Sequence, residues 1–196
     1  MTELKALILD MDGTITVPVI DFRKIKDEIG VDCDRDLVDT IAELSDERQK
    51  KAWRIINRYE ALAADRQKLQ PGFKELFSFC RNADIKVGIL TRNVQKSVNA
   101  LCDRFNITFD LTVTREFEKI KPHPAPLIHM LNTWQIAPEK ALMVGDYIHD
   151  ISCGNSAGTQ TCFFHNQGYE DYGYAANHTA RSMYQLKEII KNFKPE

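Results

Sequence analysis

Short apolar runs alternate along this chain with segments of helical period, and this alternation decides the fold class. Five such runs are bounded by polar or turn residues, at 4–9, 85–90, 109–113, 141–144 and 161–164. Segments of helical length and period follow several of them. Repeated strand–helix units predict a Rossmann-like α/β fold, with a parallel sheet covered by helices on both faces.

One part of the chain breaks the alternation. Between residues 17 and 70 no strand is expected, only charge-rich segments of helical character. Three helices are predicted there, near residues 22–29, near 37–44 and from Ser45 onward. We therefore expect a core domain of residues 1–16 and 71–196, with an all-helical cap, 17–70, inserted after the first strand. Such a cap would cover the carboxyl end of that strand and select substrates, unless it is a solvated bulge without a gating role.

Composition narrows the classes of partner. A chain of 196 residues with 43% hydrophobic residues can form one domain plus a small insertion. Its net charge of −2 gives no reason to expect nucleic acid or an anionic membrane as partner.

No run approaches the ~18 apolar residues of a membrane span, and no signal peptide is recognised. The five cysteines are scattered and form no C-x-x-C pair, so we expect a reducing cytoplasm. No pattern predicts an oligomeric state.

Two carboxylates, Asp10 and Asp12, follow the first apolar run directly. Side chains two residues apart on a strand share a face, so both would enter one pocket. Two anions so close raise each other's pKa unless positive charge lies between them. A bound divalent cation or a shared proton would relieve the repulsion, and either outcome indicates a chemical function.

Further polar residues follow the other predicted strands: Thr91 and Arg92, then Lys121, then Asp146 and Asp150. Each alone has an ordinary explanation as a surface charge, a helix cap or a tight turn. Together they are expected at one edge of the sheet, where ligands bind in folds of this class.

The residue types at this edge suit a phosphoryl group. Asp10, Asp12 and Asp146 would form an oxygen-rich site for a hard cation, for which we expect Mg²⁺. Lys121 and the Thr91 hydroxyl would add donors for anionic oxygens. An aspartate can then act as nucleophile through an aspartyl-phosphate intermediate.

These motifs resemble those of the haloacid dehalogenase-like superfamily of phosphatases. The DMDGT segment at 10–14 matches the first motif, Thr91 the second, Lys121-Pro122 the third, and Gly145-Asp146 with Asp150 the fourth. The resemblance covers residues 1–16 and 71–196. The helical insertion resembles the family's C1-type cap, and the segments TRN and KPHPAP resemble the phosphoglycolate-phosphatase-like branch.

The resemblance implies a role for each matching residue. Asp10 would be the nucleophile, and Asp12 would protonate the leaving oxygen and then deprotonate the attacking water. Mg²⁺ would be held by Asp10, the backbone carbonyl of Asp12 and Asp146.

The remaining matches concern the phosphoryl group. Thr91 and Lys121 would hold its oxygens, and Arg92 beside Thr91 is a further candidate for contact with the substrate. Asp150 would act in the second shell of the metal, through water or by orienting Lys121.

We therefore expect an Mg²⁺-dependent phosphatase that hydrolyses a small phosphomonoester. Asp12 disfavours the dehalogenases of this fold, which lack an aspartate at that position. A phosphomutase and a non-catalytic binding or regulatory protein remain as alternatives. The substrate stays open: His123 or His149 could touch it, as could six basic residues of the cap, or all could be solvated. Those six are Arg23, Lys24, Lys26, Arg48, Arg54 and Arg58.

Overall fold

The computed structural model describes residues 2–19, 21–32, 37–64, 66–167 and 171–195, so Cys33 lies outside the described part. It divides into two compact units: Met1–Pro18 with Lys68–Glu196, and Val19–Gln67. The division lies two or three residues inside the expected 17–70 boundary. The reason is that the two connecting segments pair with each other: the Val17 amide donates to the Lys68 carbonyl, and the Gln70 amide to the Ile15 carbonyl, both at 2.9 Å.

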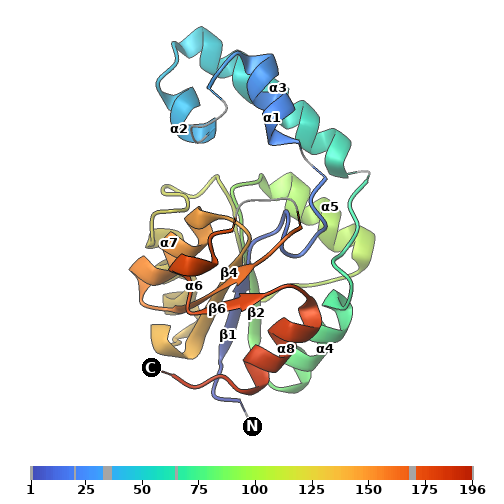
Figure 1. Ribbon diagram of the computed structural model, residues 1–196, viewed down its shortest axis with the longest axis vertical. Helices are drawn as coiled ribbons and strands as arrows, with labels where there is room; N and C mark the ends of the chain where they lie inside the picture. Colours follow the sequence, from blue (N-terminus) through green and yellow to red (C-terminus); the bar gives the residue numbers. More distant parts are fainter. Residues whose placement is uncertain (1, 20, 33–36, 65, 168–170, 196) are drawn as a thin grey trace. The chain divides into compact units, whose positions relative to one another are not determined.

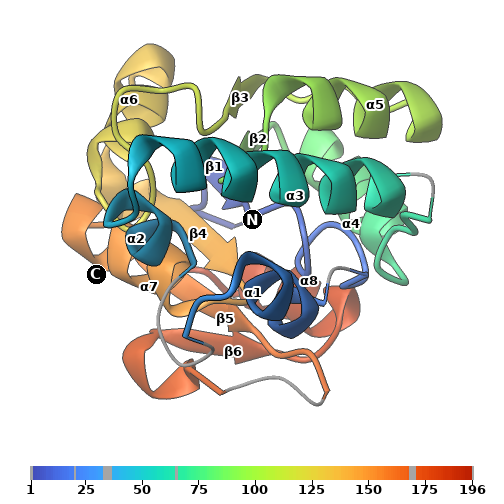
Figure 2. The same ribbon diagram turned by 90° about the horizontal axis from the view of Figure 1, so that it is seen from above.

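The larger unit contains a six-stranded parallel sheet in the order β3-β2-β1-β4-β5-β6 (Figures 1 and 2). The strands are β1 Ala6–Leu9, β2 Lys86–Leu90, β3 Leu111–Val113, β4 Ala141–Gly145, β5 Gln160–Phe164 and β6 His178–Ala180. Strands β1, β4 and β5 are buried along their whole length, as expected for strands covered on both faces. The expected fold class is confirmed.

Helices cover both faces of this sheet (Figures 1 and 2). Helices α4 (Phe73–Asn82), α5 (Gln95–Phe105) and α8 (Met183–Lys191) pack on one face, and α6 (Ala125–Trp134) and α7 (Ile148–Ala157) on the other. Two short 3₁₀ turns lie at Pro138–Lys140 and Gly173–Ala175. A hydrophobic core lies on each face of the sheet. Alternate residues of β1 pack into one core or the other, because successive side chains on a strand point to opposite faces.

Two elements at the C-terminal end were not expected from the sequence. Strand β6 is three residues long with one fully buried residue, which is too short to give a clear period. Helix α8 has an N-cap and an apolar face, which are typical of a helix. The Ser182 hydroxyl accepts a hydrogen bond from the Gln185 backbone amide, and the helix buries Met183, Leu186 and Ile190 on one side.

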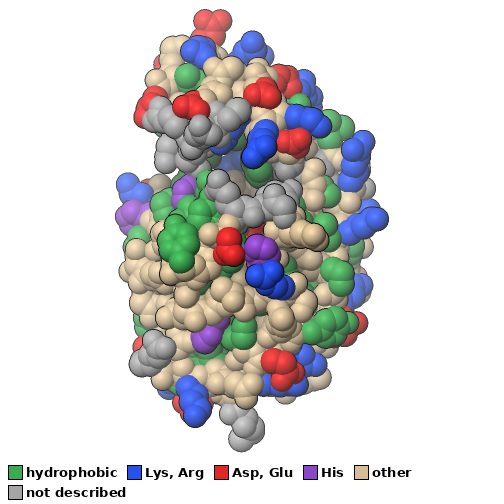
Figure 3. Space-filling model, in the orientation of Figure 1, with side chains coloured by type: hydrophobic (Ala, Val, Ile, Leu, Met, Phe, Trp, Pro, Cys, Tyr) green, Lys and Arg blue, Asp and Glu red, His purple; other side chains and the backbone are tan. Residues whose placement is uncertain are grey.

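The smaller unit is all-helical, with α1 (Phe22–Ile29), α2 (Leu37–Ala42) and α3 (Asp46–Ala64). The Asp21 carboxylate caps α1, and Gly30 ends it in the left-handed conformation. Its core consists of Ile25, Leu37, Ile41, Ala52, Ile55 and Ile56. On the face shown in Figure 3, acidic and basic side chains intermingle over these helices. Among the described residues, no helix combines the length and apolar character that crossing a bilayer requires.

Candidate active site

The register of the sheet brings three strand ends to one level. Leu9 of β1 pairs with Ile89 of β2 and with Val144 of β4. Asp10 still belongs to the sheet through its amide, which donates to the Val144 carbonyl at 2.9 Å. The residues that follow β1, β2 and β4 therefore meet at the carboxyl edge, as expected.

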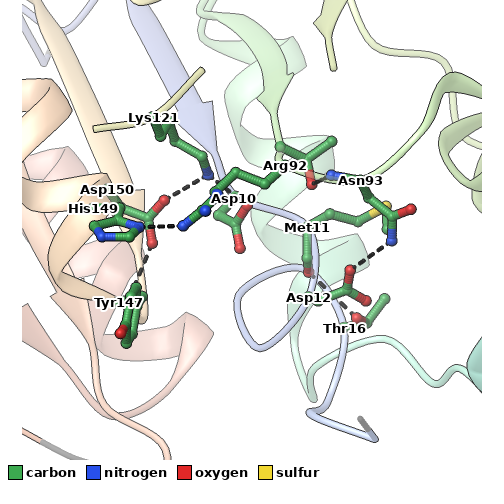
Figure 4. A network of polar contacts seen from close by, with 11 residues as sticks. Asp10, Met11, Asp12, Thr16, Arg92, Asn93, Lys121, Tyr147, His149 and Asp150 are labelled. Carbon is green, nitrogen blue, oxygen red and sulfur yellow. Dashed lines mark hydrogen bonds and ion pairs between the residues drawn. The ribbon is translucent and has the colours of Figure 1, made fainter. Parts of the chain in front are cut away.

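Directly after Asp10 the chain leaves the strand and turns. The amides of Ile15 and Thr16 donate to the Met11 carbonyl at 2.9 and 3.0 Å, and Gly13 adopts a φ of 83°. Because the strand ends at Leu9, Asp10 and Asp12 do not share a strand face as the sequence spacing suggested. Figure 4 shows Asp10 reaching toward Lys121 and Asp12 toward Asn93.

Three carboxylates form an acidic cluster. Oxygen atoms of Asp10, Asp146 and Asp150 all lie within 4.8 Å of one another. The sequence predicted a cluster of Asp10, Asp12 and Asp146. The structure brings Asp10 and Asp146 together, and the third carboxylate of the cluster belongs to Asp150 instead of Asp12. The Asp12 carboxylate instead accepts a hydrogen bond from the side-chain amide of Asn93 at 3.0 Å.

Lys121 is the buried cation of this acidic cluster. Its ammonium lies 2.6 Å from Asp10 Oδ1 and 2.5 Å from Asp150 Oδ1, with only 2% of its side chain exposed. The other oxygen of Asp150 accepts from the Tyr147 amide at 3.1 Å, at the start of α7. Asp150 is therefore fixed from two sides and in turn fixes Lys121 (Figure 4).

Burial dominates the titration of the acidic cluster. It raises the pKa of Asp10 to about 6. The positive charge of Lys121 lowers this pKa, and the negative charge of Asp150 raises it further. The like-charged neighbour with the largest effect is Asp150, whereas the sequence pointed to Asp12. Burial also raises the pKa of Asp146 well above its ordinary value, with Asp10 and Asp150 adding to the rise. Burial disfavours the Lys121 ammonium, but the two carboxylates outweigh it and hold its pKa above the ordinary value.

The donor set suits a hard divalent cation. Three carboxylates around one ammonium leave excess negative charge, and carboxylate oxygens are the ligands that Mg²⁺ prefers. Gly13 leaves room at the same place, because a Cβ atom there would lie 2.0 Å from Asp146 Oδ2.

The residues after β2 lie beside the acidic cluster. The buried Thr91 hydroxyl accepts a hydrogen bond from the backbone amide of Asn93 at 3.1 Å. Arg92 extends from the end of β2 to the first turn of α7, where its Nη1 contacts His149 Nδ1 (Figure 4). Because a guanidinium only donates, His149 Nδ1 is the acceptor in this hydrogen bond. His123 is exposed, and its Nδ1 accepts from the Ala125 amide at 3.1 Å at the start of α6.

Two further residues belong to this edge and were not singled out from the sequence. Asn166 donates to the Gly13 carbonyl at 2.8 Å and to Asp146 Oδ2 at 3.1 Å. Gln70 donates to Asn166 Oδ1 at 3.2 Å and to the Gly13 carbonyl at 3.3 Å. Asn166 comes two residues after β5, so the rule that selected polar residues behind strands would have found it.

Some of the basic residues of the helical unit have acidic partners within that unit. Arg58 lies 2.5 Å from Glu28, and Lys24 lies 3.4 Å from Asp21. These are exposed ion pairs, which contribute little to stability.

Known proteins resemble the chain along most of its length. The family model described as haloacid dehalogenase-like hydrolase matches residues 23–164. A haloacid dehalogenase-like hydrolase domain-containing protein of Arabidopsis thaliana is 39% identical over 85% of this chain and 73% of its own. An uncharacterized hydrolase of Saccharomyces cerevisiae is 35% identical over 100% of this chain and 95% of its own.

Two phosphatase-named proteins are more distant. A phosphoglycolate phosphatase of Nitrosococcus oceani is 27% identical over 94% of this chain and 95% of its own. The crystal structure of a predicted phosphoglycolate phosphatase from Haemophilus somnus aligns with a TM-score of 0.75 and 21% identity, covering 96% of this chain and 99% of that one. At that identity the structural likeness concerns the fold alone.

Proposed function

The chain belongs to the haloacid dehalogenase-like hydrolase family, and from this premise we propose that it is an Mg²⁺-dependent phosphatase acting on a small phosphomonoester. The observation that carries the proposal is the position of Lys121, whose ammonium bridges Asp10 and Asp150 beside Asp146. A buried ammonium next to three carboxylates is suited to a site that accepts both a cation and an anionic phosphoryl group.

The proposed reaction has two steps, and Asp10 is the nucleophile in the first. An Asp10 carboxylate oxygen bonds to phosphorus while the bond from phosphorus to the leaving oxygen breaks, and Asp12 gives that oxygen its proton. In the second step Asp12 takes a proton from water, the water oxygen bonds to phosphorus, and phosphate leaves Asp10. The hydrogen bond from Asn93 orients Asp12 for both transfers.

Lys121 and Thr91 are proposed to hold the phosphoryl oxygens. An ammonium has three donors, so its contacts with two carboxylates are compatible with a third hydrogen bond to a phosphoryl oxygen. The Thr91 hydroxyl accepts from the Asn93 amide, which is compatible with donation of its own proton. Arg92 would add a second positive charge, and its contact with His149 keeps it at this edge of the sheet.

Mg²⁺ would be held by Asp10, Asp146 and the backbone carbonyl of Asp12. When bound, it would neutralise the carboxylates and polarise the phosphoryl group. Asp150, which lies 2.5 Å from the Lys121 ammonium, would orient Lys121 or reach the metal through water. The helical unit, which enters the chain shortly after the DMDGT segment, is proposed to act as the cap that selects the leaving group.

Release of phosphate from a generic aryl phosphate, followed with and without MgCl₂, tests this proposal. We expect turnover that depends on Mg²⁺ and is abolished by Asp10→Asn, with the variant still folded by circular dichroism. Conversion of a sugar 1-phosphate to its 6-phosphate without free phosphate would instead indicate a mutase. Absence of turnover on a panel of phosphorylated metabolites, with Mg²⁺ shown to bind, would indicate a non-catalytic binding protein.

A further inference from the structure

Two amide side chains form a hydrogen-bonded chain that ends on Asp146. Gln70 Nε2 donates to Asn166 Oδ1 at 3.2 Å, and Asn166 Nδ2 donates to Asp146 Oδ2 at 3.1 Å. Both amide nitrogens also donate to the Gly13 carbonyl, at 3.3 Å from Gln70 and 2.8 Å from Asn166. These contacts join the turn after β1, the end of β4 and the segment after β5.

The contacts allow only one orientation of the Asn166 amide. If it were rotated by 180°, its oxygen would face both the Gly13 carbonyl and the Asp146 carboxylate, and its NH₂ group would face that of Gln70. Gln70 therefore stabilises the orientation of Asn166 that the Gly13 carbonyl and the Asp146 carboxylate require. Since Gln70 follows Gln67, the last residue of the helical unit, by three positions, this support comes from the segment by which the chain returns from that unit.

Asp146 needs such support because of its neighbours. Asp10 and Asp150 repel its carboxylate, and burial penalises its charge. The hydrogen bond that Asn166 donates to Asp146 Oδ2 offsets part of this repulsion and keeps the carboxylate from rotating. A ligand that is already oriented binds a metal more tightly than one that must first be ordered.

We propose that Asn166 is a positioning residue for the metal ligand Asp146, and that Gln70 acts on Asp146 through Asn166. The inference rests on the proposed function, because it takes Asp146 to be a ligand of Mg²⁺. It assigns a role to two residues outside the family motifs found in the sequence.

The affinity of the full-length protein for Mg²⁺, measured by isothermal titration calorimetry, tests the inference without reference to activity. We expect Asn166→Ala to weaken Mg²⁺ binding by about 10–100-fold, the usual effect of losing a partner of a metal ligand. Asn166→Leu, which keeps the volume and removes the donor, should show the same loss and guards against a packing effect. Gln70→Ala should weaken Mg²⁺ binding by a smaller factor. In the Asn166→Ala background, the same substitution should cause no further loss of Mg²⁺ affinity.

Asn177→Ala is the matched control. Asn177 Oδ1 accepts from the amide and the hydroxyl of Thr161, at 2.8 and 3.0 Å, near the start of β5 and thus at its other end. This variant also removes side-chain hydrogen bonds of an asparagine, and its affinity for Mg²⁺ should stay within twofold of the wild type.

Two results would overturn the inference alone: wild-type affinity in both Asn166 variants, or an equal effect of Gln70→Ala in the presence and absence of Asn166. A wild-type protein that binds no Mg²⁺ would overturn the proposed function and this inference together.

Discussion

At the scale of single residues, Lys121 is the counter-ion that two carboxylates, Asp10 and Asp150, share. Replacing it by methionine keeps the aliphatic chain and leaves Asp10 and Asp150 without their common counter-ion. Breaking a buried ion pair typically costs about 3–5 kcal/mol, so we expect Lys121→Met to lower the free energy of unfolding by that order. Urea unfolding at pH 7 measures the change.

Lys86→Met is the control for this prediction. Lys86 pairs with Asp110 at 3.3 Å, but nearly half of its side chain is exposed and Asp110 also contacts Arg81. An exposed pair contributes roughly 0–1 kcal/mol, so this variant should remain close to the wild type. A loss in Lys86→Met as large as that in Lys121→Met would contradict the importance given to the acidic cluster.

Asp10 gives the metal-free protein a characteristic dependence on pH. Its pKa is raised from 3.8 to about 6 in the folded chain, so between these values the folded state binds more protons than the unfolded state. The free energy of unfolding must then fall as the pH rises from 4 to 6, by about 2 kcal/mol from Asp10 alone. Urea unfolding in EDTA at pH 4.5 and pH 7 measures this slope.

Two comparisons assign this slope to the acidic cluster. Asp10→Asn should flatten it, because the variant lacks the titrating group and also relieves the repulsion that raises the pKa of Asp146. Saturating MgCl₂ at pH 7 should restore stability to the wild type, since the cation binds the ionised carboxylates. An unchanged slope in Asp10→Asn would contradict this assignment.

At the scale of elements, the turn after β1 depends on a glycine for two separate reasons. Gly13 has a φ of 83°, and a Cβ atom there would lie 2.0 Å from Asp146 Oδ2. Gly13→Ala should therefore add backbone strain of about 1–2 kcal/mol and also displace Asp146. The expected result is lower thermal stability together with weaker Mg²⁺ binding by calorimetry.

Gly158→Ala separates these two effects. Gly158 ends α7 with a similar φ of 78°, but the nearest neighbour of an added Cβ is Pro138 at an ordinary 3.6 Å. Its alanine variant should show the backbone strain and keep the wild-type affinity for Mg²⁺. Equal Mg²⁺ affinities in the two alanine variants would mean that the contact between Gly13 and Asp146 has no effect on the site.

The elements were predictable from the sequence where their pattern was strong. Strands β1 and β4 are continuous buried runs, and their register alone brings Asp10 and Asp146 together. Strand β6, with three residues, has no period long enough to be recognised. The position of Asp12 was not predictable, because period-two alternation applies only while the strand lasts and β1 ends at Leu9. The contacts of Asn166 and Gln70 join segments far apart in the chain, which no local pattern encodes.

At the scale of the whole molecule, the two units have cores of different size. Among the described residues, the core of the helical unit contains six that are buried, whereas the larger unit has two clusters on the faces of its sheet. Opening a unit exposes its buried apolar surface, so a small core gives a low free energy of opening. In hydrogen exchange monitored by mass spectrometry, we expect the amides of α1 and α3 to exchange through lower-energy openings than those of β1 and β4.

Mg²⁺ should then act on one unit only. All the proposed ligands, together with Lys121, Asn166 and Gln70, belong to the larger unit. A ligand that binds only the folded form stabilises it by RT ln(1 + [L]/Kd), which is about 2.7 kcal/mol at one hundred times Kd. Saturating MgCl₂ should therefore slow exchange in β1 and β4 and leave α1 and α3 unchanged. Equal protection of α1 and α3 would show that the helical unit is thermodynamically coupled to the acidic cluster even without substrate. The same experiment on Asp146→Asn, in which MgCl₂ should no longer protect β1 and β4, ties the effect to the site itself.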